Sequence, residues 1–241
     1  MIPKIIHYCW FGRNPLPALA VKCLDSWKKF LPEYEIREWN EDNFPLDEFR
    51  FAKEALESRK FAFVSDVCRL WALREFGGVY MDTDVEVLKP LDAFLPLAAF
   101  SGFENDHVVP TGIMASEKGG QWVTELLAYY NDRSFFLADG SFDVKSNTLI
   151  ITDMMVAKGF VMNNSFQEIP GYVTFYTNDY FCPKSYKTGR IERTKNSHTI
   201  HHFAKSWIKP HKRWQNILKM KVMAVVGYEN VQPIIDFIKR R

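Results

Sequence analysis

Several features that mark particular classes of protein are missing from this 241-residue sequence. No run of 18 or more apolar residues occurs, so we expect no membrane-spanning helix. The first residues lack the basic start, apolar centre and small-residue cleavage site of a secretory signal. The chain also has no G-x-x-x-x-G-K phosphate loop, no internal repeat and no Gly/Ser linker. These absences disfavour a P-loop protein and favour a single domain.

Cysteine is scarce, and none of the four cysteines forms a C-x-x-C pair. Each of them has apolar neighbours, which favours reduced, buried thiols over a disulfide framework or a zinc site. We therefore expect a cytoplasmic protein.

Net charge is also small, at +2, which is too little to indicate a nucleic-acid partner. Basic residues are nevertheless concentrated from Lys184 to Arg213, and the chain ends Lys239-Arg240-Arg241. A solvated basic face explains this pattern as well as peripheral association with an anionic membrane at its inner face does. Both interpretations stay open.

The hydrophobic pattern predicts an α/β fold, because strands and helices alternate in the first half of the chain. A strand over residues 5–11, a helix over 18–30 and a strand over 34–39 form a βαβ unit with parallel strands. Further helices are expected at 63–76, 121–130 and 148–157, and further strands at 79–81, 108–115, 173–176 and 198–203. We expect an open, mainly parallel central sheet of Rossmann-like type.

A pair of carboxylates stands where the third expected strand ends. The helix over 63–76 stops at Gly77-Gly78, a short strand follows, and the chain runs directly into Asp82-Thr83-Asp84. Ligands of such sheets bind at the carboxyl ends of the strands. Two carboxylates at this spacing suit Mg²⁺ or Mn²⁺, with phosphate completing the shell. A D-x-D triplet alone is more often a surface turn, so the context decides.

The preceding helix supplies that context. Asp66 and Arg69 are three residues apart and share a helix face, where they form an ion pair or a polar binding surface. The string from Ser65 to Asp84 resembles the S-D-x-x-R…G-G-x-Y-x-D-x-D pattern of glycosyltransferase family 32, which includes capsular polysaccharide synthesis enzymes and fungal α-mannosyltransferases. The catalytic domains of clostridial glucosylating toxins carry a similar pattern.

Two flanking regions extend the resemblance. The opening Ile2-Pro3-Lys4-Ile5-Ile6-His7-Tyr8-Cys9-Trp10-Phe11-Gly12, with Ser26-Trp27 and Trp39-Asn40 after it, is similar to the start of this family. His201-His202-Phe203-Ala204-Lys205-Ser206-Trp207 resembles its closing H-x-x-x-S-W element. No family motif follows Trp207. The resemblance implies a GT-A fold over residues 1–207, and we expect a helical extension over 208–241 packed on it.

The resemblance also implies roles for individual residues. Asp82 and Asp84 would hold Mn²⁺, or Mg²⁺, against the diphosphate of a nucleotide-sugar, and Asp66 and Arg69 would grip hydroxyls of the donor sugar. The implied catalytic set is Asp66, Arg69, Asp82 and Asp84. The implied set around the nucleotide-sugar is Tyr8, Cys9, Trp10, Asp66, Arg69, Asp82, Ser206 and Trp207. Position and residue type alone add Asn40 to this set, although a cap or turn role is commoner for such a residue.

The third metal ligand is expected from the histidine pair. We choose His202, with His201 as the alternative, because adjacent strand residues point to opposite faces and only one can face the site. Residue type and position also suggest the sugar or acceptor cleft for Thr111, Asn147 and Asp153, although a cap or turn role is commoner for such residues.

The resemblance therefore implies a metal-dependent glycosyltransferase that retains anomeric configuration. The expected donor is a nucleotide-sugar, with UDP favoured over GDP, carrying a hexose or N-acetylhexosamine. The expected acceptor is a bacterial glycan, as in capsular polysaccharide biosynthesis, or a lipid-linked saccharide. The alternatives are a nucleotidyltransferase-type metal enzyme and an inactive module that binds nucleotide or glycan.

Overall fold

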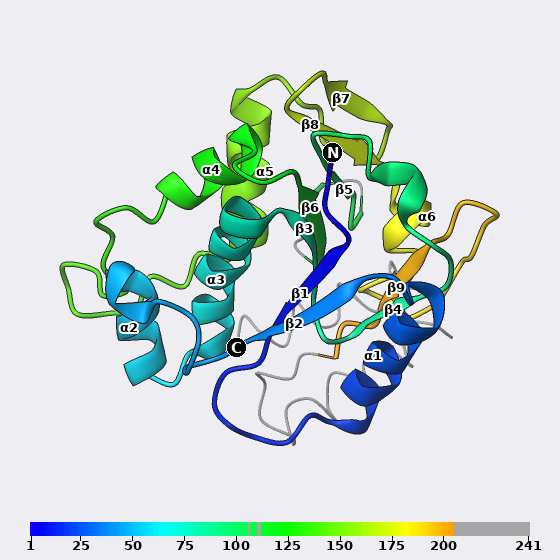
Figure 1. Ribbon diagram of the computed structural model, residues 1–241. Coiled ribbons are helices and arrows are strands. Elements are labelled where there is room, and N and C mark those ends of the chain that lie inside the picture. The colour runs from blue at the N-terminus through cyan, green and yellow to red at the C-terminus, as the bar shows by residue number, and fades with distance from the viewer. Residues whose placement is uncertain (106, 110–111, 205–241) are drawn as a thin grey trace, which may run out of the picture.

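Seven strands form the central sheet of the computed structural model, which describes residues 1–105, 107–109 and 112–204 (Figure 1). In spatial order they are β2 (Glu35–Trp39), β1 (Ile5–Cys9), β3 (Gly78–Met81), β6 (Ile113–Ser116), β5 (Ala99–Gly102), β8 (Val173–Tyr176) and β7 (Gln167–Ile169). Strands β6 and β7 run opposite to the others. The sheet is thus mixed, with mainly parallel strands, and the predicted fold class is confirmed.

Helices cover both faces of this sheet. In Figure 1, α2 (Arg50–Glu57), α3 (Phe61–Phe76), α4 (Gln121–Ala128) and α5 (Asn147–Ala157) gather on one side, and α1 (Ala18–Phe30) and α6 (Asn178–Phe181) on the other. Short 3₁₀ turns occur at Leu46–Glu48 and Asp92–Phe94. Two hydrophobic clusters fill the interior, and β3 contributes to both. Tyr80 belongs to one cluster and its neighbours Val79 and Met81 to the other, as strand alternation requires.

Local sequence explains the boundaries of the two helices nearest the site. Helix α1 buries Ala20, Cys23 and Trp27, whose spacing of three and four residues places them on one face. Helix α3 ends at Gly77, which has φ of 65°. A Cβ atom there would lie 2.6 Å from the backbone nitrogen of Lys118, so glycine is required both for the conformation and for the close approach.

A second, two-stranded sheet lies beside α1. It consists of β4 (Val85–Val87) and β9 (Thr199–His201), which pair antiparallel. The Ser26-Trp27 pair fastens this sheet to α1. The Trp27 indole donates to the carbonyl of Val85 at 2.7 Å, and the backbone N–H of Val87 donates to the Ser26 hydroxyl at 2.9 Å. The motif seen in the sequence thus holds the strand that follows the D-x-D triplet.

Most expected elements are present, with altered bounds. Helix α1 matches the expected range, and α3 begins two residues before it. The strand expected over residues 108–115 was wrong in extent, because β6 starts only at Ile113 and Val108 makes an isolated bridge to Asn105. Strands β4, β5 and β7 and helices α2 and α6 were not expected. The extension over residues 208–241 lies outside the described residues.

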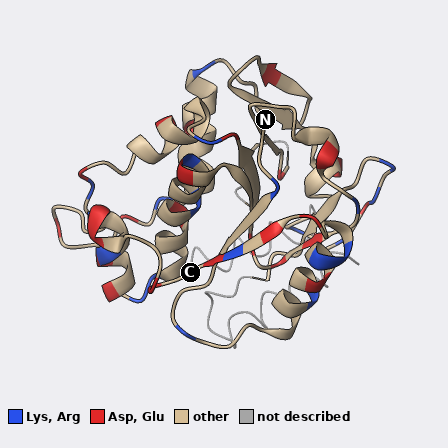
Figure 2. Ribbon diagram, viewed as in Figure 1, with Lys and Arg blue, Asp and Glu red and all other residues tan. Residues whose placement is uncertain are grey.

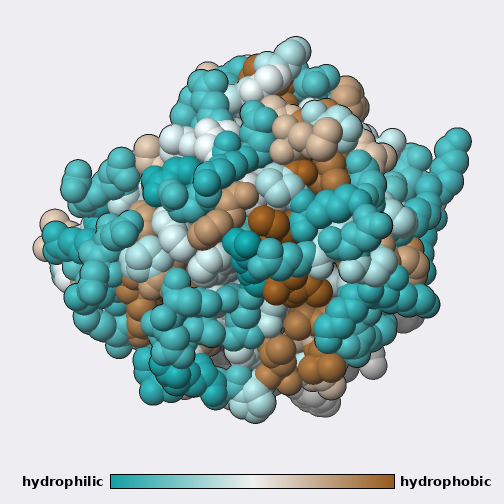
Figure 3. Space-filling view, viewed as in Figure 1, coloured by the Kyte–Doolittle hydropathy of each residue, from teal (hydrophilic) through white to brown (hydrophobic). Residues whose placement is uncertain are grey.

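In the view of Figure 3 the surface is mainly hydrophilic, with hydrophobic groups in its centre and lower part. In Figure 2, Lys and Arg are interspersed with Asp and Glu along the ribbon. All four cysteines are buried and none forms a disulfide. Among the helices that the structure describes, none is both long and apolar enough to cross a membrane.

Candidate active site

The Asp82-Thr83-Asp84 triplet forms a turn that joins the central sheet to the small one. The N–H of Val85 donates to the carbonyl of Asp82 at 2.9 Å and closes the turn. The N–H of Asp82 donates to the carbonyl of Gly112 at 2.9 Å, which ties the turn to the segment before β6. The carboxylates therefore stand at the end of β3, where the sequence places them, but they are positioned by two sheets rather than one.

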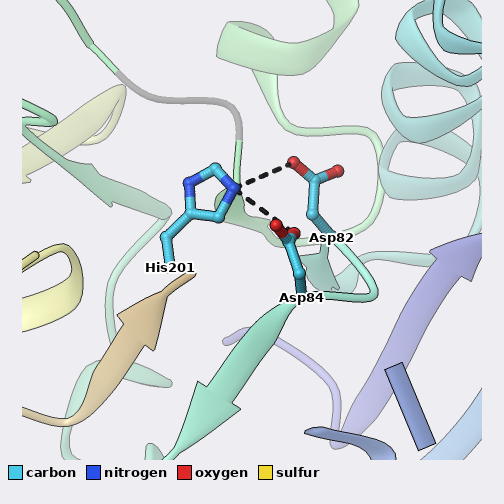
Figure 4. A group of neighbouring side chains, drawn as sticks. All are labelled: Asp82, Asp84 and His201. Atoms are coloured by element: carbon cyan, nitrogen blue, oxygen red, sulfur yellow. Dashed lines mark ion pairs between the residues drawn. The ribbon is translucent and has the colours of Figure 1, made fainter. Parts of the chain in front are cut away.

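His201 completes a cluster with these two carboxylates (Figure 4). It is the last residue of β9 and pairs with Val85 of β4. Its Nε2 atom lies 3.3 Å from Oδ1 of Asp84 and 3.9 Å from Oδ2 of Asp82. All three residues are partly buried, and one ligand atom from each is close enough to the other two to bind one common cation.

The cluster fits a hard divalent cation. One ligand atom from each residue lies within 4.8 Å of the other two. Ligands about 2.1 Å from an octahedral cation are separated by about 3.0 Å along an edge and about 4.2 Å across the ion. The separations of 3.3 and 3.9 Å from the imidazole fall within that span. Two carboxylates and one imidazole suit Mn²⁺ or Mg²⁺, with open positions left for phosphate oxygens.

The structure places His201, rather than the chosen His202, at the carboxylates. The Nε2 atom of His202 makes a 2.7 Å contact with Oε2 of Glu86, and its backbone N–H donates to the carbonyl of Asp84 at 2.9 Å. The two side chains point to opposite faces of the strand, as expected, but the register of β9 turns His201 toward the turn. His201 therefore replaces His202 as the candidate third ligand.

Without a cation, the imidazole and Asp84 stabilise each other as an ion pair. Burial alone would raise the pKa of Asp84, but His201 and the N–H of Ala204, 2.6 Å from Oδ2, outweigh it and lower this pKa to about 2. Burial alone would lower the pKa of His201, and the Asp84 charge raises it well above the usual value. A bound cation would take the place of that proton, so binding should release it.

A second polar group lies beside the cluster, on α3. Arg69 reaches Oδ1 of Asp66 at 3.1 Å and Oδ1 of Asp82 at 3.4 Å, and its guanidinium stacks over the Tyr80 ring at 4.6 Å. The Tyr80 hydroxyl donates to Oδ1 of Asp82 at 2.8 Å. Asp66 and Arg69 are 8% and 5% exposed, so this is a buried polar network and not a surface ion pair. Burial raises the pKa of Asp66 to about 6.

Asn147 joins this network from α5. Its Nδ2 donates to the backbone carbonyl of Asp66 at 3.1 Å, whereas its buried Oδ1 has no hydrogen-bond partner among the described residues. A buried acceptor without a partner is costly, so this atom is a candidate for a ligand hydroxyl. Asp153, by contrast, is exposed and pairs with Lys145 at 2.7 Å, so nothing connects it to the cluster.

The residues expected around the nucleotide lie near the end of β1. Pairing of β1 with β3 stops at His7, whereas pairing with β2 continues to Cys9. The Tyr8 hydroxyl and the Asn40 amide both donate to Glu38, at 2.6 and 3.0 Å. The half-buried Trp10 follows the strand, and its indole donates to the carbonyl of Asn14. The predicted residues Thr111, Ser206 and Trp207 lie outside the described residues.

Sequence reasoning missed two residues that shape the site. Gly112 accepts from the backbone of Asp82 and lies against the His201 ring, where a Cβ atom would stand 2.7 Å from Nδ1. Tyr80 was part of the quoted motif but was given no role, and it orients Asp82. The signal for Tyr80 was its position two residues before Asp82 at the end of the strand, because alternation that continues into the turn puts both side chains on one face.

Comparison with known proteins finds similarity to glycosyltransferases. Residues 17–101 match the family described as "Glycosyltransferase sugar-binding region containing DXD motif". The chain is 26% identical over 130 residues to inositol phosphoceramide mannosyltransferase 3 of Schizosaccharomyces pombe, and 28% identical over 120 residues to mannosyl phosphorylinositol ceramide synthase CSH1 of Saccharomyces cerevisiae. These matches cover 52% and 48% of this chain but only 36% and 32% of the two relatives.

Solved structures share the fold. The PaToxG glycosyltransferase superposes with a TM-score of 0.52 and 17% identity, over 65% of this chain and 70% of that one. The glycosyltransferase GlyE of Streptococcus pneumoniae superposes with a TM-score of 0.50 and 11% identity, over 95% of this chain and 64% of that one. The GT-A fold and the family resemblance expected from the sequence are both confirmed.

Proposed function

Because the chain carries a glycosyltransferase sugar-binding region with a DXD motif on a GT-A fold, we propose that it transfers a sugar from a nucleotide-sugar to a glycan or lipid-linked acceptor. The transferred sugar is a hexose or N-acetylhexosamine, and UDP is the favoured nucleotide. Of the two yeast relatives, one is named as an inositol phosphoceramide mannosyltransferase and the other as a mannosyl phosphorylinositol ceramide synthase, so GDP-mannose and lipid acceptors belong in any test.

The observation that carries this proposal is the continuity of two polar groups. Asp82 belongs to the cation cluster through His201 and to the α3 network through Arg69, so one carboxylate joins the two. A nucleotide-sugar has the matching layout, since its diphosphate and its sugar are directly bonded. A cation at the cluster with a sugar on Asp66, Arg69 and Asn147 would put the bond to be broken between them.

The chemistry follows from where negative charge develops. A divalent cation held by Asp82, Asp84 and His201 would neutralise the charge that grows on the leaving diphosphate. Arg69 donates fixed hydrogen bonds to sugar hydroxyls, and Asp66 accepts from them in its ionised form. Because Asp66 and Arg69 are buried, they hold the sugar in one orientation and exclude water from the anomeric carbon. Retention of configuration remains part of the proposal, from the family resemblance.

Donor turnover tests the proposal. The protein is incubated with UDP- and GDP-sugars, including GDP-mannose, with Mn²⁺, with Mg²⁺ or with EDTA, and released nucleoside diphosphate is measured. We expect release of nucleoside diphosphate from one donor, and both EDTA and Asp84→Asn should abolish it. Asp25→Asn, at an exposed ion pair with Lys28 on α1, is the matched control and should keep full activity. Release of pyrophosphate instead would indicate a nucleotidyltransferase, and the absence of both turnover and metal-dependent nucleotide binding would refute catalysis.

A further inference from the structure

Lys184 lies next to the candidate cation site without belonging to it. It follows α6, and its ammonium donates to the backbone carbonyl of His202 at 2.8 Å. The backbone N–H of His202 donates to the backbone carbonyl of Asp84 at 2.9 Å. The ammonium is thus linked through the backbone of one residue, His202, to the strand end that carries His201 and to the turn that carries Asp84.

In the part of the chain that the structure describes, no ion pair neutralises the charge of Lys184. Among the described residues, no carboxylate lies within 4.0 Å of its ammonium, although the side chain is half-buried. Burial lowers the pKa of Lys184, and the Asp84 charge opposes that effect. The neighbouring carboxylate of Glu86 is already held by Lys22 at 3.1 Å and by His202 at 2.7 Å. A half-buried ammonium in this position is suited to bind an anionic group of a ligand.

We propose that Lys184 binds an oxygen of the donor diphosphate and stabilises the charge that this group acquires as it leaves. This inference rests on the proposed function. A diphosphate bound to a cation at Asp82, Asp84 and His201 would bring anionic oxygens to the same strand end. Lysine is a compact point charge on a flexible stem, so its ammonium can turn to phosphate while remaining near the His202 carbonyl.

The chemical step needs no proton from Lys184. The bond between the anomeric carbon and the phosphate oxygen breaks, and its electron pair stays on that oxygen. A new bond forms from the acceptor oxygen to the anomeric carbon, and the acceptor proton passes to the departing phosphate. Lys184 remains an ammonium throughout and counters the negative charge, as preorganised cations do in phosphoryl and glycosyl transfer.

Three variants of the full chain test this role. Lys184→Met removes the charge and keeps much of the stem, Lys184→Arg keeps the charge, and Lys187→Met alters an exposed lysine in the same segment as a control. Turnover of the UDP- and GDP-sugar panel gives kcat and KM. Calorimetry with Mg²⁺ gives affinities for UDP and GDP, and for uridine and guanosine, which lack phosphate.

Loss of a charge-assisted hydrogen bond to phosphate should lower kcat/KM and nucleoside diphosphate affinity by about 10- to 100-fold in Lys184→Met. Affinity for the unphosphorylated nucleoside should stay unchanged, Lys184→Arg should recover most of the loss, and Lys187→Met should match wild type. Turnover and UDP or GDP affinity within about twofold of wild type in Lys184→Met would overturn the inference while the proposed function stands.

Two other results would also overturn it. Equal losses of nucleoside and nucleoside diphosphate affinity in Lys184→Met, with a lowered melting temperature, would assign Lys184 a structural role. Wild-type protein that neither turns over a donor nor binds UDP or GDP with metal would remove the proposed function and this inference together. The wild-type arm therefore separates the failure of one from the failure of both.

Discussion

Gly112 offers a direct test of the role of His201, because a methyl group at this position must displace the imidazole. A Cβ atom on Gly112 would stand 2.7 Å from Nδ1 and 3.0 Å from Cε1 of His201. Unstrained contacts of this kind need about 3.5 Å, so Gly112→Ala should move the ring or the Gly112 backbone by roughly 0.8 Å. That backbone also accepts from the N–H of Asp82, so neither movement leaves the cluster unchanged.

A shift of this size exceeds the tolerance of a ligand set, which is about 0.5 Å. Changes in groups that orient metal ligands typically cost about 10- to 100-fold in metal affinity or activity. We therefore expect Gly112→Ala to raise the Mn²⁺ concentration for half-maximal donor turnover by about 10- to 100-fold. The assay is nucleoside diphosphate release during a Mn²⁺ titration, with calorimetric Mn²⁺ binding as the second measurement.

Gly119→Ala is the matched control. No heavy atom lies within 4 Å of a Cβ at Gly119, but φ there is +69°, so alanine should cost about 1–2 kcal/mol of stability without touching the site. Its Mn²⁺ dependence should equal that of wild type. If Gly112→Ala showed the same unchanged Mn²⁺ dependence, the imidazole would either not be a ligand or not be held by Gly112. The assignment of His201 as a ligand positioned by Gly112 would then be wrong.

Three further predictions concern the scaffold, the histidine pair and the pH dependence of stability. Trp27→Phe removes a buried 2.7 Å hydrogen bond and should lower the free energy of unfolding in urea by about 2–4 kcal/mol. Trp122→Phe, at a buried indole whose N–H has no partner among the described residues, should cost about 1–2 kcal/mol less, and equal costs would contradict the role of the bond. His201→Ala should abolish metal-dependent turnover while His202→Ala keeps the wild-type metal requirement; the reverse result would restore His202 as the ligand. Burial raises the pKa of Asp66 from 3.8 to about 6, so the protonated carboxyl stabilises the fold fully below about pH 4. As the pH rises from there through 6, the free energy of unfolding should fall by about 3 kcal/mol. Urea denaturation without metal should show this decline, and Asp66→Asn should flatten it; an unaltered slope would exclude the assignment.

Local signals in the sequence were enough for the part of the site on α3 and β3. The helix pattern, the double glycine that stops it and the short buried strand lie within one continuous string that ends at Asp84. Each feature depends on residues a few positions apart, so helix spacing and strand alternation predicted that Asp66 and Arg69 share a face. The 3.1 Å ion pair between them confirms that shared face.

Long-range features could not be predicted in the same way. Strands β4, β5 and β7 have three or four residues, and alternation over so few positions does not by itself mark a strand. The equally short β3 and β8 were expected because each carries two or more β-branched or aromatic residues, whereas β5 and β7 carry only one each. The contact of Gly112 with His201 joins segments far apart in the chain, and no local pattern marks a glycine needed for close approach. The orphaned Oδ1 of Asn147 likewise depends on how α5 packs against α3, so residue type alone gave only a weak indication.

Which of His201 and His202 faces the carboxylates depends in part on a motif far away in the sequence, Ser26-Trp27. Alternation guarantees that only one of them faces the carboxylates, but the register of β9 against β4 decides which, and a shift of one residue would exchange them. In the observed register His201 is opposite Val85. The carbonyl of Val85 accepts from the indole of Trp27, so α1 holds one edge of β4 while β9 pairs with the other edge. The Ser26-Trp27 motif, which touches no ligand atom, therefore helps to select the histidine that can reach Asp82 and Asp84.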